Sequence, residues 1–285
     1  MRAACCKATV LSHSAPAADI RLLRVLWPDP GHAPHAGQFF TLRSWGAEEA
    51  PFLSRPISVH KWEPETLTVS FLYQIVGQGT ARLAALKEGD ALQLTGPMGN
   101  GFDVPDIAAR YEKIALVGGG IGTAPLYQLA RELAAAGRKP DVFFGFRDEP
   151  YCMEQYRGLA GLVKVSTDSG RVGFHGFVTQ LYDPAAYDVV LICGPTPMMR
   201  NAARLCAEKG TPCLVSLEKK MACGIGACLG CTIETASGAG ASARTAPSLR
   251  ERRCLDGRPE NGTVGLCHEQ PGDRRVGHGG LRRGV

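Results

Sequence analysis

Three cysteines in a short glycine-rich segment constrain this chain more than any other feature. Cys223, Cys228 and Cys231 follow a C-x4-C-x2-C spacing within residues 221–231. A plant-type iron–sulfur loop uses this spacing to bring three thiolates to two irons, with a fourth cysteine further along. Small residues between the cysteines let backbone N–H groups turn toward the sulfurs. A group of buried, inert thiols is the alternative, but three thiols so close together favour a cluster site.

Length and composition indicate a globular protein of about two domains. The chain has 285 residues, of which 45% are hydrophobic and 21% charged. No apolar run approaches the roughly twenty residues that a membrane span needs, and the N-terminus has no long apolar stretch typical of a signal peptide. We therefore expect a cytoplasmic protein without membrane contact. Most of its eleven cysteines should be thiols and not disulfides.

The positive charge of the chain is concentrated at its C-terminal end. The net charge is +5, and the residues from Ala241 onward contain nine arginines, no lysine and five acidic residues. Such a tail could be a nucleic-acid-binding arm. No aromatic residues interleave its arginines and no recognition motif accompanies it, so we expect no nucleic-acid partner.

The first third of the chain has the pattern of a small β-barrel. Residues 20–26, 37–43 and 66–73 read as short strands, and the last of them alternates well between apolar and polar residues. Several short strands separated by turns are typical of an antiparallel barrel. We place this domain at residues 1–103.

Two motifs on the predicted barrel suggest a flavin nucleotide. The first is R-P-I-S at 55–58, where Arg55 offers a planar fork for a pyrophosphate and Ser58 a hydroxyl. The second is V-G-Q-G-T at 76–80, where Gly79 and Thr80 open a helical patch whose N–H groups could bind phosphate. Taken singly, Arg55 could be an exposed turn residue and Thr80 a helix cap. Together, the two motifs favour a flavin.

A second domain, at residues 104–215, begins with a nucleotide-binding pattern. The apolar strand 114–117 is followed by G-G-G-I-G-T-A-P at 118–125 and by a helical stretch at 126–135. A strand, a glycine-rich turn and a helix let the backbone approach a pyrophosphate at the helix N-terminus. The candidate binding residues are Gly118, Gly119, Gly120, Gly122 and Thr123.

Further apolar strands complete a doubly wound parallel sheet. We expect strands at 141–146, 162–166 and 187–192, with helical stretches between them. Cys193, Gly194 and Pro195 follow the last strand, where such a sheet faces its ligand crevice. Cys193 is either close to a nicotinamide or a buried small thiol. No acidic residue stands clearly where a ribose 2′-hydroxyl would be bound, so the residues leave NADH and NADPH both open.

These motifs, together with G-P-M-G-N-G-F at 96–102, C-G-P-T-P-M-M at 193–199 and S-L-E-K-K-M-A-C-G-I-G-A-C-L-G-C at 216–231, resemble one known family. It is the electron-transfer subunit of the dihydroorotate dehydrogenase B type, within the ferredoxin–NADP reductase-like superfamily. The resemblance runs from about residue 8 to about residue 236. The cluster loop at 216–236 is its most specific part, since other flavin reductases share the barrel motifs.

The resemblance implies cofactors, site residues and a partner. It implies FAD held by Arg55, Pro56, Ile57, Ser58, Leu72, Tyr73, Gln74, Gly79 and Thr80, and a 2Fe–2S cluster on Cys223, Cys228, Cys231 and one more cysteine. It favours NADH as electron donor and an FMN-containing catalytic subunit as partner, in a heterotetramer of two plus two. Electrons would pass between NAD(H), FAD and the cluster, to or from the interconversion of dihydroorotate and orotate in pyrimidine biosynthesis. No general acid or base is expected in this chain.

The chain departs from the family after Ala236. No cysteine lies between Cys231 and Cys254, whereas the family has its fourth cysteine a dozen or more residues after the third, in a segment like V-C-K-D-G-P-V-F. Residues 241–256, back-translated with suitable synonymous codons and read two bases later, give V-C-K-D-G-P-V-F-A-G-E-E-V-L. We interpret 237–285 as a frameshifted, disordered tail. The alternative is that Cys254, or otherwise Cys267, supplies the fourth ligand across a longer loop.

Two other functions remain open at this point. One is a subunit of an NADPH–ferredoxin or sulfide reductase, in the same superfamily. The other is a flavin-binding assembly subunit that cannot transfer electrons because its C-terminus is scrambled. Binding to a dihydroorotate dehydrogenase catalytic subunit would separate the first from our main hypothesis, and iron content would separate the second.

Overall fold

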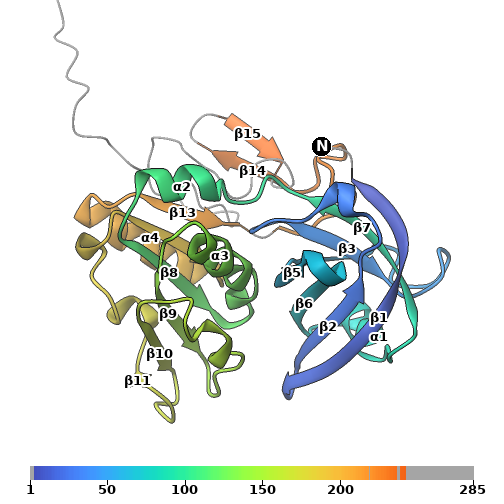
Figure 1. Cartoon of the computed structure of the whole chain (residues 1–285), viewed down its shortest axis with the longest axis horizontal. Helices are drawn as coiled ribbons and strands as arrows, with labels where there is room; N and C mark the ends of the chain where they lie inside the picture. Colours follow the sequence, from blue (N-terminus) through green and yellow to red (C-terminus); the bar gives the residue numbers. More distant parts are fainter. Residues whose placement is uncertain (1–2, 218, 236–237, 242–285) are drawn as a thin grey trace, which may run out of the picture.

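The computed structural model describes residues 3–217, 219–235 and 238–241, which form two units that lie side by side. One unit is a curved antiparallel sheet of seven strands, on the right in Figure 1, and the other is a parallel sheet of six strands flanked by helices, on the left. A small hairpin lies above the junction of the two units. The predicted combination of an antiparallel barrel with a doubly wound α/β domain is confirmed.

The barrel sheet has the strand order β4-β3-β7-β1-β2-β6-β5. Its edges are joined by the short link between β4 and β5, because Val59 N donates to Gln38 O beside β3 and His60 N donates to Ser70 O in β6. Large apolar side chains fill the interior, including Trp27 and Phe40 with ring centroids 4.9 Å apart. The elements are β1 (Ala4–Ala17), β2 (Ile20–Leu26), β3 (Phe39–Arg43), β4 (Arg55–Ser58), β5 (Lys61–Glu63), β6 (Thr68–Gln74), α1 (Gln78–Ala84) and β7 (Ala91–Met98).

The α/β unit has the strand order β11-β10-β9-β8-β12-β13, and every neighbouring pair is parallel. Alternate residues of the central strand β8 face opposite layers. Ile114 and Leu116 pack with α2 and α3, while Ala115 and Val117 pack with α4. The elements are α2 (Val104–Arg110), β8 (Ile114–Gly119), α3 (Thr123–Ala135), β9 (Asp141–Phe146), β10 (Val163–Thr167), β11 (Phe174–His175), β12 (Val189–Cys193), α4 (Thr196–Lys209) and β13 (Cys213–Ser216).

Strand positions agree closely with the sequence-based prediction, but two helices do not form. The strands predicted at 20–26 and 141–146 have the same bounds as β2 and β9. The helices expected between the later strands are wrong on either side of β10. The β9–β10 connection contains only a 3₁₀ turn. The β10–β12 connection contains the strand β11 and two further 3₁₀ turns. The 3₁₀ turns are Pro30–His32, Pro64–Thr66, Gly120–Gly122, Glu154–Tyr156, Val178–Gln180 and Pro184–Ala186.

The segment after β13 leads into the cysteine loop and then into a hairpin. Strands β14 (Thr232–Thr235) and β15 (Gly238–Ala241) are antiparallel, so pairing extends beyond residue 236, where we ended the cluster segment. The residues after 241, including Cys254 and Cys267, lie outside the described part of the chain. Within the described part, the longest helix is α4, and no helix has the length and apolarity that a bilayer crossing requires.

Candidate functional site: a pocket between the two units and a cysteine loop beside it

A pocket of about 360 Å³ lies where the barrel, the α/β unit and the segment after β13 meet. The two strands that carry its barrel wall are β4 and β6. The turn from β8 to α3 supplies the opposite wall, and the segment after β13 supplies a third. Its lining residues are Gly37, Phe39, Arg55, Pro56, Ile57, Ser58, Leu72, Tyr73, Gln74, Val76, Thr80, Ile121, Ala124, Pro125, Ser216, Leu217, Lys219 and Met221. Eight of the nine residues predicted to hold FAD therefore line one cavity, and the ninth, Gly79, is adjacent to Thr80.

Arg55 is the charged residue at the barrel wall of this pocket. Its Nη2 donates to Leu53 O at 2.6 Å, and its Nε is buried without a hydrogen-bond partner among the described residues. A buried guanidinium N–H without an acceptor is costly, so it points to a polar or anionic ligand. Gly79 lies against this side chain, because a Cβ on Gly79 would be 2.7 Å from Arg55 Cδ. The arrangement fits the diphosphate of a flavin dinucleotide.

Thr80 has a structural role as well as a place in the pocket wall. Its Oγ1 accepts hydrogen bonds from the backbone N of Val76 at 3.0 Å and of Gly77 at 3.2 Å, and donates to Gly77 O at 2.9 Å. The hydroxyl thus closes the turn that precedes α1. Gly77 is the N-cap residue of α1 and Thr80 is the third residue of the helix, so the hydroxyl of Thr80 supports the cap while the residue also lines the pocket.

Three of the four predicted nucleotide-binding glycines are explained by close packing. A Cβ on Gly118 would be 2.8 Å from the Phe144 ring, and a Cβ on Gly119 would be 2.5 Å from Met198 Sδ. At Gly122 the added atom would be 2.4 Å from the Cα of Gly194. Gly120, with φ +52°, is the exception because it has open space around it. Gly122 brings the backbone of the turn close to the end of β12, Gly118 and Gly119 make room for the side chains of Phe144 and Met198, and Gly120 leaves a free approach for a ligand.

The second predicted nucleotide-binding turn, at 193–195, packs against the first. Cys193 is the last residue of β12, pairs with Gly118 of β8 and is 1% exposed. Gly194 has φ +157° and lies against the backbone of Gly119. Pro195 precedes α4 as its N-cap residue. The buried-thiol alternative for Cys193 agrees with its burial, and its position at the carboxyl end of the sheet agrees with the ligand crevice.

The cysteine loop turns backbone N–H groups toward one sulfur. Gly224 and Gly226 have positive φ angles of +69° and +73°. The backbone N–H of Cys228 donates a hydrogen bond to Cys223 Sγ at 3.4 Å. The N–H of Cys228, with those of Ile225 and Ala227, lowers the pKa of the Cys223 thiol to about 6. A thiolate stabilised by backbone donors is the form that binds iron. The donor set therefore fits a cluster.

The third cysteine of the loop connects it to the pocket. Cys231 is 1% exposed and is buried against Phe39 and Met98, with Met221 packed beside them. Phe39 and Met221 also line the pocket. Across residues 3–217, 219–235 and 238–241, no three His, Cys, Asp or Glu side chains are gathered closely enough to hold a metal ion. None of the nine cysteines in those ranges forms a disulfide bond.

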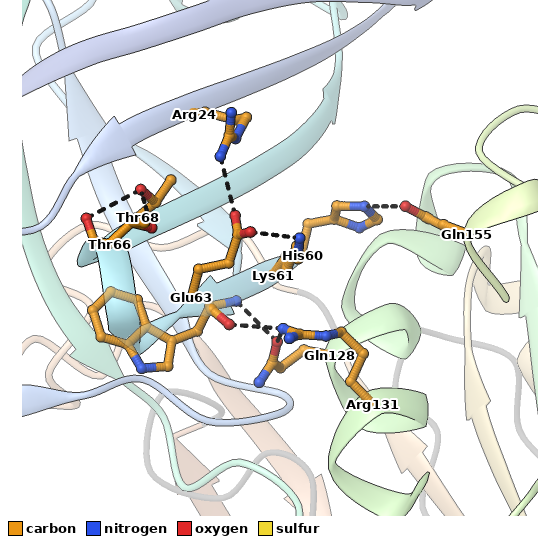
Figure 2. Close-up of polar contacts among 10 residues, drawn as sticks. Arg24, His60, Lys61, Glu63, Thr66, Thr68, Gln128, Arg131 and Gln155 are labelled. Atoms are coloured by element: carbon orange, nitrogen blue, oxygen red, sulfur yellow. Dashed lines mark hydrogen bonds and ion pairs between the residues drawn. The ribbon is translucent and has the colours of Figure 1, made fainter. Parts of the chain in front are cut away.

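His60, which the sequence analysis missed, links the barrel to the α/β unit. Its Nδ1 lies 2.8 Å from the carbonyl oxygen of Ala124. Its Nε2 lies 3.2 Å from Gln155 Oε1, and this second contact is drawn in Figure 2. The ring also stacks on Tyr127 with centroids 4.9 Å apart. Burial lowers the pKa of His60 to about 4. Since Ala124 lines the pocket, this contact fixes two of its walls relative to each other.

A second set of contacts joins β5 to α3. Trp62 N donates to Gln128 Oε1 at 2.9 Å, and Arg131 Nη1 donates to Trp62 O at 2.7 Å. Figure 2 shows the side chains of Gln128 and Arg131 reaching from α3 to β5. On the barrel side, Arg24 and Lys61 both donate to the carboxylate of Glu63. The sequence of β5 does not predict these contacts, because they are made by the backbone N and O of Trp62 and not by its side chain.

Comparison with known families identifies related proteins. Residues 218–257 match the family model of the iron–sulfur cluster binding domain of dihydroorotate dehydrogenase B. The dihydroorotate dehydrogenase B (NAD(+)) electron transfer subunit of Clostridium acetobutylicum is 43% identical over 221 residues, which is 78% of this chain and 82% of that protein. The protein of the same name from Caldanaerobacter subterraneus subsp. tengcongensis is 39% identical over 253 residues, 88% of this chain and 94% of that protein.

Solved structures share the arrangement of the two units. A chain of the NADH-dependent reduced ferredoxin–NADP oxidoreductase, described in the context of flavin-based electron bifurcation, superposes with a TM-score of 0.74 at 26% identity, covering 83% of this chain and 85% of that one. The ferredoxin reductase in carbazole 1,9a-dioxygenase has a TM-score of 0.63 at 24% identity, covering 74% of this chain and 68% of that one. The second similarity concerns the fold alone.

Proposed function

This chain belongs to the family of dihydroorotate dehydrogenase B electron-transfer subunits, and from that premise we propose how its own residues serve the function. The subunit passes electrons between NAD(H), FAD and a 2Fe–2S cluster, to or from a catalytic partner subunit. One observation carries the proposal for the site. The pocket that contains the buried, unpaired Arg55 Nε is walled on its far side by the segment that leads into the cysteine loop.

We assign the flavin site to eight pocket residues and to Gly79 beside them. Bound FAD exchanges two electrons with a nicotinamide and single electrons with an iron–sulfur cluster. Arg55 binds the diphosphate, and Gly79 leaves the room that its side chain needs. Ile57 and Tyr73 provide apolar walls for the flat ring, and Ser58 offers its hydroxyl. The residues assigned to this site are Arg55, Pro56, Ile57, Ser58, Leu72, Tyr73, Gln74, Gly79 and Thr80.

We assign the nicotinamide nucleotide to the crevice at the carboxyl ends of β8 and β12. Gly120 has open space for an approaching pyrophosphate, and Thr123 begins α3, whose N-terminus favours negative charge. The backbone of Cys193 and Gly194 packs against Gly122, so the ends of β8 and β12 lie side by side there. Ile121, between Gly120 and α3, also lines the flavin pocket, which supports a nicotinamide site beside the flavin.

We assign the cluster to Cys223, Cys228, Cys231 and Cys254. The family-model match spans residues 218–257, and these are the four cysteines within that span. The buried position of Cys231 against Phe39, a pocket residue, supports a short path between cluster and flavin. A frameshift between 237 and 241 remains the alternative for the tail, and it would remove the ligand that the family has in its V-C-K-D-G-P-V-F segment.

We also propose the partner and its stoichiometry. The relatives are named as electron transfer subunits, which supports a separate catalytic subunit. We infer that this partner contains FMN and that two copies of each chain form a heterotetramer, in the cytoplasm. Ile225 and Leu229 of the cysteine loop are 52% and 65% exposed, which supports a contact surface beside the cluster.

Iron, acid-labile sulfide and FAD per chain, measured on protein produced anaerobically from this sequence, test the assignment. We expect about two irons and one FAD per chain. Cys254→Ser should lose the iron and keep the FAD, whereas Cys267→Ser, in the same tail, should keep both. Wild-type protein with FAD but without iron would contradict the Cys254 assignment and favour the frameshift and an electron-transfer-inactive subunit.

A second experiment tests the partner. Mixing this chain with a catalytic subunit should give a complex of two plus two chains by light scattering. Failure to bind it would favour a ferredoxin-reductase-type subunit.

A further inference from the structure

Two cationic side chains line the flavin pocket in the described part of the chain. Arg55 and Lys219 are the only cationic residues that line it in the described structure, and no acidic residue described there lines it. Lys219 has no ion-pair partner among the described residues. Two cations with no acidic residue among the described lining residues indicate an anionic occupant.

Strand register places the Arg55 end. In the β3–β4 pair, Leu42 is opposite Arg55 and Phe39 is opposite Ser58. Arg55 and Ser58 are three residues apart on one strand, which corresponds to about 10 Å along the pocket wall. The Arg55 end also holds Gly79, next to Thr80. This is the end assigned to the diphosphate.

The packing of Met221 places the other end. Met221 packs against the buried cluster of Phe39, Met98 and Cys231, so the segment after β13 reaches the pocket at the Phe39–Ser58 end. Lys219 is two residues before Met221 and lines the same pocket. Two residues span at most about 7 Å, so the backbone of Lys219 lies near the Phe39–Ser58 end of the pocket, beside the segment that leads into the cysteine loop.

We propose that Lys219 is the cation that stabilises the reduced flavin ring and thereby raises the reduction potential of bound FAD. This inference rests on the proposed FAD site. The isoalloxazine ring is neutral when oxidised, and it carries one negative charge after it has taken up two electrons and one proton, which NADH supplies on becoming NAD⁺. A positive charge near the ring stabilises that anion more than the neutral ring, and so favours reduction.

The position of Lys219 has a consequence for electron transfer. The residue precedes Cys223 by four positions, in the segment that connects β13 to the cysteine loop. The same segment therefore supplies a charge to the flavin and a ligand to the cluster.

The test compares wild type with three variants of the full chain, each loaded with FAD. Lys219→Gln removes the charge, Lys219→Arg keeps it, and Lys220→Gln removes the charge of the adjacent, exposed lysine. The FAD of each protein is brought to redox equilibrium with a reference dye, and the ratio of reduced to oxidised flavin is read from its absorbance. FAD affinity is measured alongside by fluorescence titration.

We expect Lys219→Gln to lower the equilibrium constant for FAD reduction by on the order of tenfold, with Lys219→Arg and Lys220→Gln close to wild type. FAD affinity should change little in all three, because the oxidised ring is neutral. An equilibrium constant in Lys219→Gln within twofold of wild type, or an equal fall in Lys220→Gln, would overturn the proposal while leaving the FAD site intact. Absence of FAD binding by wild-type protein would overturn the FAD site itself.

Discussion

The flavin pocket and the cysteine loop lie next to each other and are built in opposite ways. The pocket is bounded by two sheets that are fastened together through buried contacts such as His60 with Ala124. The loop is a glycine-rich surface segment in which Cys228 is exposed, and the described residues contain no ready group of three metal ligands. From this comparison we infer that the proposed flavin site is shaped by the fold, and that the proposed cluster ligands are brought together by the metal.

The largest expected effect is on iron and concerns the loop alone. Cys228→Ser replaces a thiolate ligand with a weakly acidic hydroxyl, so we expect iron to fall from about two per chain to nearly none. Iron and acid-labile sulfide assays check this on anaerobically purified protein. Cys5→Ser, at an exposed cysteine on β1, is the control and should retain its iron. Full iron content in Cys228→Ser would remove this residue from the ligand set.

The next effect concerns the pocket alone. Arg55→Gln removes the guanidinium whose Nε is buried and unpaired, and should weaken FAD binding by on the order of tenfold to a hundredfold. Arg204→Gln, at an exposed arginine on α4, should leave the affinity unchanged. Fluorescence titration of the apoprotein with FAD measures both. Equal affinities for the two variants would show that Arg55 does not contact the cofactor.

A smaller effect tests how tightly the turns of the α/β unit are packed. The Cβ added by Gly122→Ala would be 2.4 Å from the Cα of Gly194, where only backbone could yield. We expect a loss of about 1–3 kcal/mol in the free energy of unfolding, measured in urea. Gly79→Ala meets the flexible Arg55 side chain instead, so it should weaken FAD binding more than it lowers stability. The opposite pattern in the two variants would contradict these packing arguments.

The last effect appears only in acid and concerns the junction of the two units. The pKa of His60 is lowered from 6.5 to about 4 by burial, so between these values the unfolded chain binds a proton that the folded chain does not. Stability should therefore fall as the pH drops below 6.5, by about 2 kcal/mol at pH 5. Urea unfolding at pH 7.5 and 5 measures it. His60→Gln should reduce the difference, and His175→Gln, at an exposed histidine, should not. An unchanged difference in His60→Gln would show that His60 does not cause it.

Strands and cofactor motifs could be predicted from the sequence because their signals are local. A short apolar run such as 141–146 predicts a buried strand from its own residues, and β9 forms there. The R-P-I-S motif at 55–58 likewise predicted residues that line the pocket. The C-x4-C-x2-C spacing indicates a cluster site within nine residues, 223–231. These features depend on neighbours in the chain, which a sequence contains directly.

The features that escaped prediction depend on contacts between distant segments. His60 follows a strand without any periodic pattern, and its role arises from Ala124 and Gln155, 64 and 95 residues away. The third wall of the pocket, at 216–221, was assigned to the cluster segment by its sequence and lies against the flavin site only in three dimensions. The missing helices around β10 are replaced by 3₁₀ turns, and β15 has the sequence Gly-Ala-Gly-Ala, which carries no strand signal.

FAD per chain in the cluster-free Cys228→Ser variant is the most direct test of the contrast between the two regions. A pocket shaped by the fold should bind about one FAD per chain with wild-type affinity, although the iron is gone. Loss of FAD together with the iron would contradict this account, because it would mean that the cluster, and not the packing of the two sheets, shapes the flavin site.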